Sequence, residues 1–79
     1  MRILDAATDR SCDRITCFLT RSEASELRDA LDALLTGPAE HHQHVPSEDF
    51  KKEITVCVYS LGDLTVFDHR SRLLIEEDR

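Results

Sequence analysis

The sequence predicts a small α+β domain in which a long helix packs on one face of a small antiparallel sheet of three to four strands. Three observations lead to this prediction. A central segment repeats apolar residues at helical spacing, two segments alternate in polarity as strands do, and helix formers are frequent near the end of the chain. The expected order of elements is β-β-α-β-β-α, in a single domain over residues 1–79.

The first two strands are expected before the central helix. Residues 2–8 form a short strand, and the polar turn 9–13 joins it to a second strand at 14–20. Side chains of the second strand alternate between the two faces of the sheet, so that Cys17 lies on the apolar face and Phe18 on the other.

The central helix is expected at residues 21–36. Thr20 and Glu23 fit a capping box, and Gly37 with Pro38 ends the helix, with the glycine in the left-handed conformation. Six apolar residues recur at spacings of three and four and are expected to form one stripe that faces the sheet: Ala24, Leu27, Ala30, Leu31, Leu34 and Leu35.

A hairpin is expected next, with strands at 41–45 and 53–60. If the chain turns at Pro46–Asp49, Val45 pairs with Phe50, and the apolar face also carries Ile54, Val56 and Val58. In this register His42 lies opposite Glu53, and His44 lies opposite Lys51. His42 and His44 then project together from the other face, and a slip by one residue would exchange the two faces.

The C-terminal stretch contains a second helix, expected at residues 68–77 with Asp68 or Asp63 as its N-cap. Residues 64–67 fit either a strand or the beginning of a helix.

The histidine cluster is the first candidate site. Two imidazoles at i and i+2 of a strand share a face and can bind one divalent ion, with Glu53 as a third ligand beside His42 and His44. The alternatives are a solvent-facing hairpin that binds only adventitious zinc or nickel, and a pH sensor. No physiological cofactor is expected.

The cysteines are the second candidate. Cys12, Cys17 and Cys57 are an odd number without CxxC spacing, which is typical of free thiols in a reducing compartment, so a cytoplasmic location is expected. A nucleophilic Cys57 with His42 or His44 is conceivable across the hairpin, but no third orienting group is identified, so the chain is not expected to be an enzyme.

The charge bears on the partner. A net charge of −6 and a pI near 5.0 disfavour nucleic acids and anionic membrane surfaces, and suit a basic protein partner. No apolar run approaches the ~18 residues of a membrane span. Arginine outnumbers lysine eight to two, which suggests a GC-rich bacterial source.

A semi-apolar sheet face is the third candidate, formed by Phe18, Thr55, Cys57 and Tyr59. Either a partner binds there or the C-terminal helix covers it. The function expected is that of a small acidic protein acting through protein–protein contact, as an accessory, regulatory or antidote-like subunit. The partner is another protein or a second copy, in a homodimer. The alternative is a metal-binding or metal-sensing module at His42 and His44.

Overall fold

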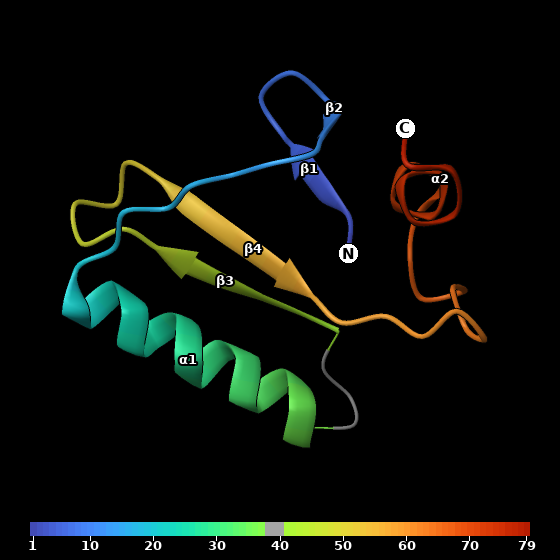
Figure 1. Cartoon of the computed structure of the whole chain (residues 1–79). Coiled ribbons are helices and arrows are strands. Elements are labelled where there is room, and N and C mark those ends of the chain that lie inside the picture. Colours follow the sequence, from blue (N-terminus) through green and yellow to red (C-terminus); the bar gives the residue numbers. More distant parts are fainter. Residues whose placement is uncertain (38–40) are drawn as a thin grey trace. The chain divides into compact units, whose positions relative to one another are not determined.

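The chain folds into two units, which are described separately. A computed structural model describes residues 1–37 and 41–79. It divides into a terminal unit, formed by Met1–Cys17 with Leu61–Arg79, and a central unit, Phe18–Ser60 (Figure 1).

The order of elements is β-β-α-β-β-α, as predicted, but the strands form two separate two-stranded sheets. The α+β class is therefore confirmed, and the prediction of a single sheet of three to four strands is wrong. The prediction of a single domain stays a prediction.

The first sheet differs from the prediction because the chain reverses early. Strands β1 (Ile3–Asp5) and β2 (Arg10–Cys12) pair antiparallel, so β2 lies where a turn was expected. The Oδ1 of Asp5 accepts a hydrogen bond of 3.0 Å from the amide of Ala7, which favours a turn at this point. Residues 14–20, all described, are not assigned to a strand, so that predicted strand is wrong.

Helix α1 (Arg21–Thr36) begins as predicted. The amide of Glu23 donates to the hydroxyl of Thr20 over 3.1 Å, and the amide of Thr20 donates to Oε1 of Glu23 over 2.9 Å, which completes the capping box. The end of the helix differs from the prediction. Gly37 has an extended backbone with φ of −97° instead of the left-handed conformation, and Pro38 lies outside the described residues.

Strands β3 (His42–Pro46) and β4 (Glu53–Cys57) form an antiparallel hairpin whose register differs from the predicted one. Val45 pairs with Ile54, and His42 pairs with Cys57 instead of Glu53. His44 lies opposite Thr55 instead of Lys51.

The predicted register is wrong because the connecting loop, 47–52, is longer than the four-residue turn expected. Within this loop the hydroxyl of Ser47 donates to Oδ1 of Asp49 and accepts from the amide of Lys52, which closes the loop on itself. The displacement of the register is an even number of residues, so each side chain of the paired strands keeps its expected face.

The core of the central unit lies between α1 and the β3–β4 hairpin. Val45 is buried on β3, and Ala30 and Leu34 are buried on α1. Ile54 and Val56 of β4 are half-buried on the same face as Val45. Two residues expected on this apolar face are exposed instead: Phe50 in the loop and Val58 beyond the end of β4.

The terminal unit is built around helix α2 (His69–Glu77). Asp68 caps it by accepting from the amide of Ser71 over 2.8 Å, which confirms the predicted helix and cap. Leu74 and Ile75 are its buried residues. Residues 64–67 form neither a strand nor a helix but a turn, closed by a 3.1 Å hydrogen bond from the amide of Phe67 to the carbonyl of Leu64.

Glu23 connects the beginning of α1 to the loop 47–52 of the hairpin. This carboxylate is expected to make the stability of the central unit depend on pH. The amides of Thr20 and Glu48 both donate to this carboxylate, the second over 2.8 Å, and these hydrogen bonds lower the pKa of Glu23 below its usual value. Since the pKa is lower in the folded chain than in the unfolded chain, the stabilisation is present above the unfolded pKa and is lost as the pH falls through the folded pKa.

The expected result is that Glu23→Gln reduces the acid sensitivity of the central unit, because glutamine keeps a capping oxygen but does not titrate. Urea unfolding of both proteins at a series of pH values between about 6 and 3 measures this difference. Glu26→Gln, at an exposed position on α1, is the matched control. Equal pH dependence of wild type and Glu23→Gln would contradict the role assigned to this carboxylate.

Candidate functional site

The histidine face of the hairpin carries the residues predicted to bind metal. His42, His44 and Glu53 belong to the face of β3–β4 opposite Val45 and Ile54. The Nδ1 of His44 lies 2.6 Å from Oε1 of Glu53, and the ring centroids of His42 and His44 are 5.2 Å apart in an edge-to-face arrangement. The structure therefore brings the three predicted residues together.

This arrangement is nevertheless not that of a closed ligand set. The Nδ1 of His44 also lies 2.9 Å from the hydroxyl of Thr55. This nitrogen therefore already contacts two protein groups, the carboxylate of Glu53 and the hydroxyl of Thr55. Within residues 1–37 and 41–79, no three His, Cys, Asp or Glu side chains are grouped as ligands of one ion. Metal binding by His42, His44 and Glu53 stays a prediction.

Cys57 pairs with His42 across the hairpin, so their side chains are neighbours on one face. The Cys57 residue is exposed, but partial desolvation of its thiol raises its pKa. A nucleophilic cysteine needs the opposite shift, because the thiolate is the reactive form. The electrostatics of this position do not favour a catalytic thiol.

The four residues predicted to form an interface do not make one continuous apolar face. Thr55 and Cys57 share the polar face of the hairpin with the histidines. Tyr59 is half-buried beyond the end of β4, and Phe18 is 93% exposed in the segment that leads into α1. Only Phe18 offers a large, fully accessible apolar side chain.

A different surface, on α1, is more apolar. The α1 stripe consists of Ala24, Leu31 and Leu35, of which Leu35 is 77% and Leu31 42% exposed. Together with Leu19, Leu27, Arg28 and Asp32 these residues line a shallow groove of about 460 Å³ along one side of the helix. Its walls are mostly aliphatic, and its charged residues lie along one border.

The sequence contained a signal for this surface. The apolar residues of α1 include two adjacent pairs, Ala30 with Leu31 and Leu34 with Leu35. Neighbouring positions on a helix are about 100° apart, so both members of a pair cannot point at the same narrow, two-stranded sheet. The first member of each pair is buried and the second is exposed.

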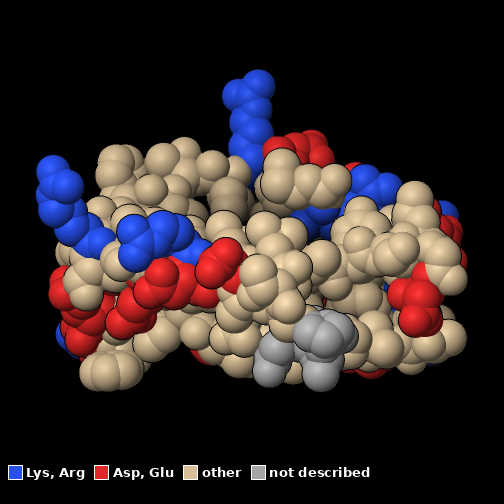
Figure 2. Space-filling model, turned by 90° about the horizontal axis from the view of Figure 1, so that it is seen from below, with Lys and Arg blue, Asp and Glu red and all other residues tan. Residues whose placement is uncertain are grey.

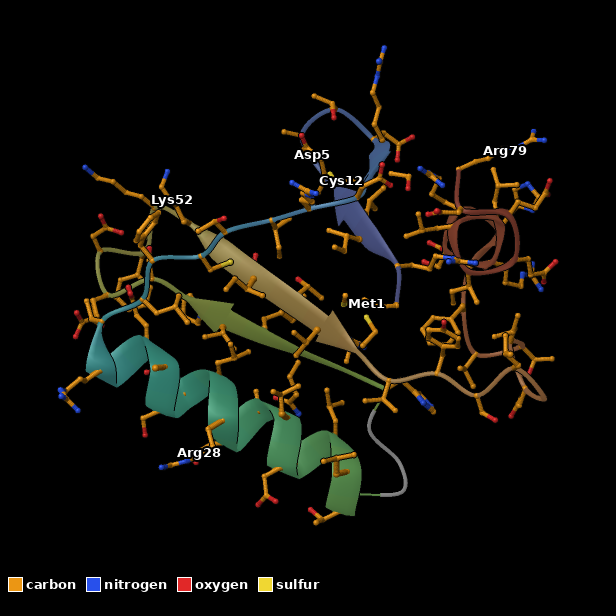
Figure 3. All side chains as sticks on the ribbon, in the orientation of Figure 1. Met1, Asp5, Cys12, Arg28, Lys52 and Arg79 are labelled. Carbon is orange, nitrogen blue, oxygen red and sulfur yellow. The ribbon has the colours of Figure 1, made fainter. Side chains whose placement is uncertain are left out.

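The charged groups of α1 are of mixed sign. In the view from the side on which α1 lies, acidic and basic side chains are interspersed and no large area of one sign stands out (Figure 2). Arg28 points away from the β3–β4 hairpin (Figure 3), and it bonds to Oδ1 of Asp29 over 3.2 Å. Such a surface does not favour an extended polyanion.

None of the described helices is long and apolar enough to span a membrane. Comparison of the chain with family models, curated proteins and solved structures finds no match.

Proposed function

We propose that this chain acts through protein–protein contact, as an accessory or regulatory subunit, and that its contact surface is the α1 stripe. The observation that carries the proposal is the exposure of Leu31 and Leu35 beside Leu19 in a single aliphatic groove. Contiguous exposed apolar surface marks interaction sites, because water in contact with it is released when a partner covers it.

Two features support the α1 stripe over the polar face of the hairpin. Leucine side chains supply more apolar area than Thr55 and Cys57, which lie among polar neighbours. The stripe also belongs to a capped helix whose inner side is anchored by Ala30 and Leu34, so that little conformational entropy remains to be lost on binding.

Site-specific photo-crosslinking tests the proposal. A benzophenone amino acid is placed at Leu35, at Thr55 or at Glu26, and the chain is expressed at its natural level in its source organism. Crosslinks to protein are expected from position 35, because its side chain would be buried against the partner. None is expected from Glu26, which is exposed on another side of α1.

The outcomes are distinct. Adducts from position 35 alone support the proposal, whether the captured chain is another protein or a second copy. Adducts from Thr55 alone would move the interface to the polar face of the hairpin and overturn the assignment of the α1 stripe. The absence of adducts at all three positions would overturn the function itself.

A further inference from the structure

The charges beside the α1 stripe are arranged so that a second copy of the helix, packed antiparallel, would place opposite charges side by side. The stripe extends along α1 from Ala24 to Leu35, so its midpoint lies just before Ala30. Arg28 lies about 2 Å from that midpoint toward the N-terminus, and Asp32 about 4 Å toward the C-terminus, at the rise of an α-helix. Both line the groove, and their spacing of four residues places them on the same border of the stripe.

We infer that the partner of the α1 stripe is a second copy of this chain, with the two α1 helices packed antiparallel across a two-fold axis. This inference rests on the proposed function and names the partner. A two-fold axis places each residue opposite one that lies equally far beyond the midpoint. The small Ala24 of each copy then lies near the large Leu35 of the other, and the two Leu31 side chains meet near the centre.

The same symmetry brings opposite charges together. The positions of Arg28 in one copy and Asp32 in the other then differ by only about 2 Å along the helix axes, and both lie on the same border of the interface. Two such ion pairs form, one on each side of the axis. A parallel two-fold arrangement would instead place the charged borders of the two copies on opposite sides of the interface, so that Arg28 of one copy would not face Asp32 of the other.

The contacts that Arg28 makes within its own chain do not prevent this pairing. Its guanidinium bonds to Asp29 and to the hydroxyl of Ser25, at 3.2 and 3.1 Å. The side chains of Arg28 and Asp29 are 75% and 70% exposed, and exposed pairs of this kind contribute little to stability. Exchanging them for Asp32 of the second copy therefore loses little.

The expected dimer is weak and reversible. The apolar contact consists of a few leucine and alanine side chains from each copy, which is smaller than a standard interface, so the dissociation constant is expected on the order of tens of micromolar.

Charge exchange at Arg28 and Asp32, followed by sedimentation equilibrium under reducing conditions, tests the inference. Arg28→Asp alone and Asp32→Arg alone each place like charges opposite one another, and each is expected to weaken the dimer at least about tenfold. Mixing the two variants pairs opposite charges at both positions, and the heterodimer is expected to regain the wild-type affinity. Glu26→Arg, which changes the charge on another side of α1, is expected to have no comparable effect.

Leu35→Glu is expected to abolish the dimer, and far-ultraviolet circular dichroism confirms that this variant is folded. A wild-type chain that stays monomeric at every concentration would overturn the inference, as would a dimer that Leu35→Glu leaves intact. Failure of the mixed charge variants to associate would overturn the antiparallel arrangement. Crosslinks from position 35 to a different protein, with a monomeric chain, would refute the second copy as partner and leave the proposed function standing.

Discussion

Replacing Leu34 by alanine is expected to lower the free energy of unfolding of the central unit by about 2–4 kcal/mol. Leu34 is only 6% exposed, in the contact between α1 and the hairpin, so the shortened side chain leaves a cavity that the few surrounding core residues cannot fill. A small domain has a total stability of only about 5–15 kcal/mol, so this change would remove a large part of the stability of the unit.

Leu35→Ala is the matched control, because it removes the same atoms from the next position of the same helix. Leu35 is 77% exposed, and its truncation is expected to change the stability of the monomer by less than about 0.5 kcal/mol. Urea unfolding followed by circular dichroism, at concentrations below those of the expected association, measures both variants. Equal losses from the two would mean that the two sides of α1 are not distinguished as the structure describes.

Arg70→Gln is expected to loosen the β1–β2 hairpin of the terminal unit. The Nε of Arg70 lies 2.8 Å from Oδ1 of Asp9, its Nη2 donates to the carbonyl of Asp9, and its Nη1 donates to the carbonyl of Arg79. One side chain thus connects the turn of the hairpin to α2 and the end of the chain. A two-stranded ribbon this short is marginal without such support.

The arginine side chain is 29% exposed but its partner Asp9 is 69% exposed, so solvent screening reduces the expected loss to about 1–2 kcal/mol. Amide hydrogen exchange in Ile3–Cys12 is expected to accelerate roughly 5- to 30-fold, the factor to which that free energy corresponds. Arg10→Gln, at an exposed position of β2, is the control. Unchanged exchange in Arg70→Gln would show that other contacts hold the hairpin.

The candidate sites illustrate how far local patterns reach. The alternation of polar and apolar residues placed His42 and His44 on one face with Glu53, and the structure has them there even though the predicted pairing is wrong. Each side chain kept its predicted face because the observed register differs from the predicted one by an even number of residues, and side-chain direction in a strand repeats every two residues. The contact of His44 with Thr55 follows from the actual register alone and was not predicted.

The α1 stripe shows where the same kind of reasoning stops. Apolar spacing alone assigned Leu31 and Leu35 to the core together with Ala30 and Leu34. Which of them are buried depends on the width of the sheet that the helix meets, and here that sheet has only two strands. Sheet width is set by pairing between distant segments, and the unpaired residues 14–20 left the hairpin narrower than expected.

The sequence by itself determined the elements whose stabilising contacts lie within one helical turn. Helix α1 with its capping box and helix α2 with Asp68 as its cap are formed by interactions between residues three or four positions apart, so the order of amino acids specifies them directly. Only the tertiary structure decided how many sheets form, in which register β3 meets β4, and which side of α1 remains open to solvent. Those outcomes depend on loop closure and on competition among distant segments for the same few pairing partners.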